Sequence, residues 1–192
     1  MSAQFRGTRP VAAGLAAAGA APTIRPMTVF DLDAVLSIEQ RAYSFPWSRG
    51  NFIDSLASGY GAWVLETSRP AESPRPVTAE PPRLLGYYLA MPGVEELHLL
   101  NITVAPDCQG QGHGRWMLGH LQQQAVAQSA PTLWLEVRAH NLRAQALYLR
   151  CGFETVGRRK AYYPAGQGQR EDALVMRKAL AQAVDPAVEG SA

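Results

Sequence analysis

Three glycines at alternate positions, in Gln109-Gly110-Gln111-Gly112-His113-Gly114, constrain this chain more than any other feature. An apolar, strand-like segment precedes them and an amphipathic pattern follows, so they predict a tight turn between a strand and a helix. Glycine lets the backbone approach a ligand closely, and the first turn of a helix presents unpaired N–H groups with partial positive charge. The segment therefore predicts a turn that can bind an anion.

The glycine turn has three other possible interpretations. A nucleotide-binding P-loop would continue with Gly-Lys-Ser/Thr, and these residues do not follow. A dinucleotide-binding turn would have the spacing G-x-G-x-x-G near the start of its domain, whereas this G-x-G-x-G segment follows a strand late in the chain. A purely structural turn rarely needs three alternate glycines.

Hydrophobic periodicity divides the rest of the chain into strands and helices. The expected strands cover residues 23–26, 61–66, 84–91, 96–104, 132–137, 153–163 and 172–178. The expected helices cover residues 30–42, 48–56, 114–127 and 141–151. Gly152 is suited to end the last helix as a C-cap glycine. This order of elements predicts an α/β domain with a mixed sheet.

Composition marks where the folded domain begins, is interrupted and ends. Residues 1–22 are rich in Ala and Gly, and we expect a disordered extension, although the basic start also resembles a secretory signal. Five prolines within residues 67–83 exclude regular structure and predict a surface loop between two hairpin strands. We expect the domain to span residues 23–180, with a frayed tail over residues 181–192.

Overall composition excludes several classes of protein. The formal net charge is +2, which is too small to favour nucleic-acid binding by bulk electrostatics. No apolar run reaches the ~18 residues of a membrane-spanning helix. The two cysteines cannot form a disulfide framework, and the four histidines are too scattered for a metal motif. We therefore expect a cytoplasmic monomer that binds no metal, membrane or nucleic acid directly.

The residues around the glycine turn resemble a family signature. The preceding strand ends in Val104-Ala105-Pro106, and Gln109, Gly112 and Gly114 then fill the pattern Q/R-x-x-G-x-G/A. This is similar to the acetyl-CoA signature of the GNAT superfamily of N-acetyltransferases. The resemblance implies the GNAT fold, with one twisted, mostly antiparallel sheet of about seven strands flanked by about four helices. It also implies acetyl-CoA as the cosubstrate.

The same resemblance implies which residues bind acetyl-CoA. Backbone amides of the turn would hold the pyrophosphate, and the preceding strand would pair with the pantetheine arm as it would with an added strand. Asn141 matches a family position that contacts the cofactor, and it is also suited to cap its helix. The candidate cofactor-binding residues are Ile102, Thr103, Val104, Gln109, Gly110, Gln111, Gly112, His113, Gly114, Arg115 and Asn141.

Four further segments resemble the ribosomal-protein-alanine N-acetyltransferases: residues 38–48, 133–141, 146–148, and 158–164 together with 170–173. The match runs from about Ile24 to about Met176. This chain departs from the family pattern only in its N-terminal extension and its proline-rich insertion. It implies acetyl transfer to the N-terminal alanine of a small-subunit ribosomal protein, S18. Transfer to other protein N-termini or to a small amine is the alternative, and a non-catalytic acyl-CoA-binding module is another.

Acetyl transfer to an amine requires a neutral nucleophile and a proton donor for the leaving thiolate. An α-amine, with a pKa of about 7.7–8.0, is far richer in the neutral form at pH 7 than a lysine, with a pKa of about 10.4. Glu136 lies in an apolar strand, on the face opposite Leu133 and Leu135. An acid there is either functional or paired in a salt bridge, for which Arg138 and Arg143 are candidates.

Tyr148 lies on the apolar stripe of its helix and, from the residues alone, is a core residue. The resemblance matches it to the catalytic tyrosine of the superfamily, and it matches Glu136 to the catalytic glutamate of the subfamily. It thus implies that Glu136 is the general base, directly or through a water, and that Tyr148 protonates the CoA sulfur. Glu39, Trp47, Tyr162 and Tyr163 are candidates for a peptide groove, with core packing as the alternative for the aromatic residues.

Overall fold

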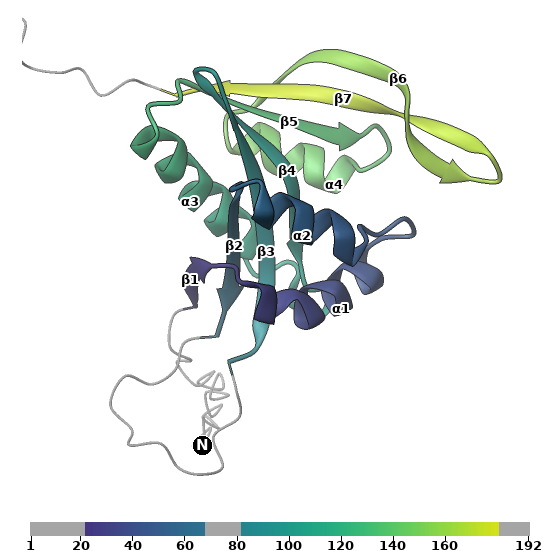
Figure 1. The fold of residues 1–192 in the computed structure, drawn as a ribbon. Coiled ribbons are helices and arrows are strands. Elements are labelled where there is room, and N and C mark those ends of the chain that lie inside the picture. The colour runs from purple at the N-terminus through teal and green to yellow at the C-terminus, as the bar shows by residue number, and fades with distance from the viewer. Residues whose placement is uncertain (1–21, 68–81, 181–192) are drawn as a thin grey trace, which may run out of the picture.

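The strands of the computed structural model form one sheet, and the structure describes residues 22–67 and 82–180 (Figure 1). The strands are β1 (Thr23–Pro26), β2 (Gly61–Glu66), β3 (Leu84–Gly93), β4 (Glu96–Val104), β5 (Thr132–Arg138), β6 (Glu154–Gly166) and β7 (Gln169–Ala179). Their order in the sheet is β1-β2-β3-β4-β5-β7-β6. Only β4 and β5 are parallel; the other neighbours are antiparallel. The predicted mixed, mostly antiparallel sheet is confirmed.

Four α-helices cover the two faces of this sheet: α1 (Leu32–Ala42), α2 (Arg49–Ala57), α3 (His113–Ala127) and α4 (Leu142–Arg150). Adjacent tyrosines of β3 identify the faces, because neighbouring side chains in a strand point in opposite directions. Tyr87 packs edge-on against Phe52 of α2 and donates a hydrogen bond to Glu39 of α1. Tyr88 instead contacts His120 of α3. Helices α1 and α2 therefore cover one face, and α3 covers the other (Figure 1).

Most element boundaries follow the local signals in the sequence. Ser48 caps α2 by accepting a hydrogen bond from the Asn51 backbone, and Gly152 follows α4 with φ +86°. The first helix begins with a short 3-10 turn, η1 (Val29–Asp31). Strands β6 and β7 are longer than predicted, because β6 is an edge strand and can accommodate Pro164.

Strands β2 and β3 pair antiparallel, as predicted for the segments that flank the proline-rich insertion. The Thr67 backbone N–H donates to the Arg83 carbonyl at 2.9 Å, so the chain segments that flank the insertion are still adjacent at these two residues. Most of the predicted loop (residues 68–81), most of the predicted N-terminal extension (residues 1–21) and the whole predicted C-terminal tail (residues 181–192) lie outside the described residues.

Strands β4 and β5 pair over only part of their length. Residues 96–99 pair with residues 132–135, and no pairing continues beyond them. In β4 a bulge leaves Leu100 unpaired, because Leu89 pairs with Asn101 while Ala90 pairs with Leu99. A bulge bends its strand, so the carboxyl ends of β4 and β5 separate. The candidate functional site lies in this separation.

Candidate active site

Two cavities open where β4 and β5 separate. The first, the α1-side cavity, has a volume of about 300 Å³ and is lined by Glu39, Phe45, Trp47, Asn101, Glu136 and Tyr163, among others. The second, the glycine-turn cavity, has a volume of about 470 Å³ and is lined by residues of the glycine turn and of α4. Tyr43, Ile102, Asn141 and Tyr148 line both. The two cavities therefore meet at these four residues.

The backbone of the glycine turn has the conformation that its sequence predicts. Gly110 and Gly112 have φ values of +83° and +86°, which strain any residue with a side chain. Gly112 is the N-cap of α3 and supplies no side-chain cap, so the first N–H groups of the helix remain available to a ligand. A Cβ on Gly114 would lie 3.1 Å from Leu147, so glycine also permits α3 and α4 to approach closely.

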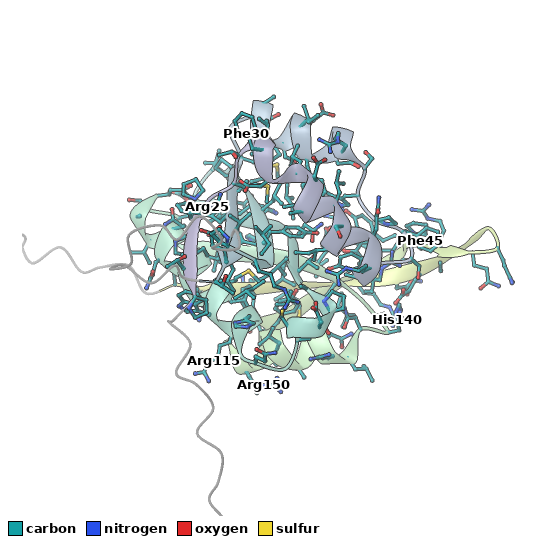
Figure 2. The ribbon with its side chains drawn as sticks, turned by 90° about the horizontal axis from the view of Figure 1, so that it is seen from below. Arg25, Phe30, Phe45, Arg115, His140 and Arg150 are labelled. Atoms are coloured by element: carbon teal, nitrogen blue, oxygen red, sulfur yellow. The ribbon has the colours of Figure 1, made fainter. Side chains whose placement is uncertain are left out.

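Three arginines line the glycine-turn cavity: Arg115 of α3, and Arg143 and Arg150 of α4. Figure 2 shows Arg115 and Arg150 on the same side of the molecule, and both line this cavity. Arg143 donates to the Gln109 side chain at 2.7 Å, and Gln109 in turn donates to the Val104 carbonyl at 3.2 Å. This positive charge suits a polyanion such as a phosphorylated cofactor. Sequence reasoning named Arg143 only as a possible partner of Glu136 and did not name Arg150, although both lie in the helix that Asn141 begins.

The β4 edge beside the glycine-turn cavity is available for backbone pairing. Within residues 22–67 and 82–180, no strand pairs beyond Leu99 with the side of β4 that faces β5, and Ile102, Thr103 and Val104 line the cavity. An extended ligand can bind such an edge as an added strand. The Ile102 carbonyl also accepts a hydrogen bond from the Tyr43 hydroxyl at 3.3 Å, and its second lone pair remains available.

Asn141 begins α4 and accepts a hydrogen bond from the Ala144 backbone at 3.1 Å. This confirms its predicted role as an N-cap. Because Asn141 also lines both cavities, the same residue remains a candidate for contact with a ligand.

Strand β5 shows the predicted alternation. Leu133, Leu135 and Val137 are buried, whereas Glu136 is half-buried and lines the α1-side cavity. The Glu136 carboxylate forms a salt bridge with Arg159 of β6, with 2.8 Å between Oε1 and Nε.

The salt-bridge partners considered from the sequence, Arg138 and Arg143, are therefore wrong. Arg138 binds Glu171, and Arg143 binds Gln109. Arg159 could not be identified from local spacing because it comes from a distant strand of the sheet.

Two tyrosines of β6 complete the surroundings of Glu136. Hydrogen bonding to Glu136 raises the pKa of Tyr162. Burial raises the pKa of Tyr163 to about 12, and its hydroxyl donates to the Glu136 carbonyl at 3.2 Å. Both tyrosines are thus protonated hydrogen-bond donors at neutral pH, and both were candidates for a peptide groove.

Tyr148 is buried and also lies where the two cavities meet. It is 7% exposed and packs edge-on against Phe153, as a core residue would. It also lines both cavities at their junction. Burial raises the pKa of Tyr148 well above that of a free phenol, so its hydroxyl retains its proton at neutral pH. A protonated hydroxyl at this junction can act as an acid.

The described residues lack two other kinds of site. Within residues 22–67 and 82–180 no helix has the length and apolarity needed to cross a membrane. Over the same ranges, no three His, Cys, Asp or Glu side chains gather as metal ligands would.

Comparison with known proteins agrees with this geometry. The profile of the acetyltransferase (GNAT) family matches residues 32–153, a segment that contains the glycine turn, Glu136 and Tyr148. The chain belongs to this family. The fold and the enzyme class predicted by resemblance are thereby confirmed, and members of the family use acetyl-CoA.

Two proteins with this fold are also similar to this chain in sequence, at more than 30% identity. The [ribosomal protein bS18]-alanine N-acetyltransferase of Salmonella typhimurium is 38% identical over 154 residues, which cover 80% of this chain and 95% of that protein. The crystal structure of the ribosomal-protein-S18-alanine N-acetyltransferase from Escherichia coli aligns with a TM-score of 0.72 at 34% identity. That alignment covers 86% of this chain and 98% of the other.

The same fold occurs in an acetyltransferase that acts on a small amine. A spermidine N-acetyltransferase chimera from Vibrio cholerae and hSSAT aligns with a TM-score of 0.67 at 18% identity, over 82% of this chain and 95% of the other. This likeness concerns the fold alone. The fold therefore does not decide between a protein N-terminus and a small amine as acceptor.

Proposed function

We propose that this acetyltransferase transfers the acetyl group of acetyl-CoA to the α-amine of the N-terminal alanine of ribosomal protein bS18. The observation that carries the proposal is the presence of Glu136 and Tyr148 on one cavity that opens into the glycine-turn cavity. The choice of acceptor is supported by the named activity of the relatives, which match over nearly their whole length.

Acetyl-CoA would occupy the glycine-turn cavity. The backbone N–H groups at the start of α3 would bind the pyrophosphate, while Arg115, Arg143 and Arg150 would offset its negative charge. The pantetheine arm would pair with the free edge of β4 at residues 102–104. Its thioester end would then reach the junction of the cavities at Tyr148.

The acceptor peptide would enter through the α1-side cavity. Its α-amine nitrogen attacks the thioester carbonyl carbon, so that a C–N bond forms and the C–S bond breaks. Glu136 takes the proton that the nitrogen loses, directly or through a water, and the Tyr148 hydroxyl gives a proton to the departing sulfur. Backbone N–H groups of β4 stabilise the negative charge on the carbonyl oxygen in the transition state.

An α-amine suits this machinery better than a lysine. With a pKa of about 7.7–8.0 against about 10.4, it needs less help from a base to reach the neutral form at pH 7. The presence of both a base and an acid on the cavity argues against a non-catalytic acyl-CoA-binding module.

The test is an acetylation assay with acetyl-CoA, read by mass spectrometry. The panel holds the N-terminal peptide of bS18, the same peptide with its α-amine blocked and a lysine added, other N-terminal peptides, and spermidine. We expect one acetyl group on the first peptide and none on the blocked one. Acetylation of spermidine without acetylation of any peptide would overturn the proposal.

A further inference from the structure

Glu39 of α1 is a buried carboxylate in the wall of the α1-side cavity, and it is only 1% exposed. Its Oε1 accepts hydrogen bonds from the Trp47 backbone N–H at 2.8 Å and from Asn101 Nδ2 at 3.4 Å. Its Oε2 accepts a hydrogen bond from the Tyr87 hydroxyl. All three donors are neutral groups.

No cation balances this carboxylate within residues 22–67 and 82–180, where every salt bridge involves another acid. A buried carboxylate is costly unless it is paired with a cation or fully hydrogen-bonded. An ionised carboxylate offers about four lone-pair sites, and three are used here. The carboxylate of Glu39 can therefore accept one further donor.

The hydrogen bonds around Glu39 are oriented as an anion would orient them. Thr103 donates its hydroxyl proton to Asn101 Oδ1 at 3.0 Å, which orients the side-chain amide with Nδ2 towards Glu39. Asn101 then donates to Glu39. The Thr103 and Asn101 protons both point along this chain towards the carboxylate.

We propose that Glu39 is the anionic site that holds the protonated α-amine of the acceptor. This rests on the proposed function, because it assumes that an amine enters the α1-side cavity. At neutral pH most α-amines carry a proton, so the acceptor arrives as a cation. Glu39 supplies the missing countercharge, whereas Glu136 already has Arg159 as its counterion.

The assignment separates two tasks between the two carboxylates of the cavity. Glu39 attracts the ammonium group, which gives up one proton to bulk water to become the neutral nucleophile, and Glu136 acts only after the attack. The acceptor nitrogen becomes positive again when it attacks the thioester carbon, so the charge on Glu39 favours this step as well. Glu136 then accepts the proton that the nitrogen loses.

The test compares two peptides that differ only in charge at the reacting end. One is the N-terminal peptide of bS18, and the other is its desamino analogue, with a propionyl group in place of alanyl. Binding of each is measured calorimetrically at pH 6.5 in the presence of CoA, for the wild type and Glu39→Gln. Glutamine keeps the size of the side chain and can still accept from Trp47 and Asn101, but it carries no charge.

We expect Glu39→Gln to weaken binding of the ammonium peptide about tenfold or more, since a charge-assisted hydrogen bond is lost. Binding of the desamino peptide should change less than about twofold on the same reasoning. Equal weakening of both peptides would reveal a purely structural role for Glu39 and overturn the assignment, as would no change in either.

A second variant keeps the assignment testable if Glu39→Gln does not fold. Tyr87→Phe retains the packing against Phe52 but removes one neutral donor from Glu39. The variant should therefore prefer the ammonium peptide over the desamino peptide more strongly than the wild type does. An unchanged or smaller preference would contradict the assignment. If the wild type binds neither peptide, both the proposed function and this assignment are overturned. If the wild type acetylates the ammonium peptide and Glu39→Gln binds that peptide as tightly as the wild type does, the assignment alone is overturned.

Discussion

Glu136 of β5 and Arg159 of β6 form a salt bridge across the intervening strand β7, with 2.8 Å between Oε1 and Nε. The Arg159 side chain is 57% exposed and that of Glu136 is 26% exposed. An exposed pair of this kind contributes at most about 1 kcal/mol to the free energy of unfolding. The pair therefore serves to orient the Glu136 carboxylate rather than to stabilise the fold.

Glu136→Gln should lower kcat by roughly 10²–10⁴-fold, because it removes the proton acceptor while keeping the shape of the side chain. The Kd of acetyl-CoA should stay nearly unchanged, since Glu136 does not line the glycine-turn cavity. Steady-state kinetics and calorimetry check the two parts. Arg159→Gln is the matched control, and its loss in kcat should be much smaller. Wild-type turnover in Glu136→Gln would exclude the assigned role.

Tyr148→Phe should also lower kcat by roughly 10²-fold or more without weakening acetyl-CoA binding, since only the acidic hydroxyl is removed. The pH profile provides a second check. Burial raises the pKa of Tyr148, so its proton is present below that raised value and is lost only as the pH rises through it. Wild-type kcat should therefore show no alkaline decline below about pH 10, the ordinary phenol pKa. A decline centred near pH 8 would contradict this assignment.

Gly112→Ala should raise the KM for acetyl-CoA and leave the KM for the peptide unchanged. Alanine at φ +86° costs roughly 1–2 kcal/mol, and relief of this strain would turn the helix N–H groups away from the pyrophosphate. Gly119→Ala is the matched control in the same helix, because a Cβ there meets nothing within 4 Å and its φ is not positive. It should stabilise the protein by about 0.5–1 kcal/mol in thermal unfolding. Equal effects of the two variants on the KM for acetyl-CoA would show that the turn has no special role.

The parts of the site that depend on local geometry could be predicted from the sequence. Leu133, Leu135 and Glu136 alternate between faces because successive side chains in a strand point in opposite directions. The glycine turn could also be predicted, since positive φ at Gly110 and Gly112 is a property of the residue type.

The contacts between distant segments could not be predicted in the same way. Arg159 reaches Glu136 only through the register of β6 on β7, which shifts at three places. A shift of one residue would turn Arg159 to the other face, and no local pattern reports such a shift. The surroundings of Glu39 likewise depend on the bulge at Leu100. Tyr148 is both buried and cavity-lining, so its spacing could not separate a core role from a catalytic one, and the catalytic prediction rests on the family resemblance.

Arg150→Gln should test whether the arginines of the glycine-turn cavity act on phosphate groups. Acetyl-CoA carries the pyrophosphate and ribose phosphate, whereas acetyl-pantetheine has the same thioester without them. We expect the variant to raise the KM for acetyl-CoA by about tenfold at low salt, the loss of a charge-assisted contact, and to leave the KM for acetyl-pantetheine unchanged. The difference should shrink at high salt, because ions screen exposed charges. Arg49→Gln, on α2 and outside both cavities, is the matched control. A rise in KM that is the same for both thioesters would mean that Arg150 shapes the cavity rather than binding phosphate.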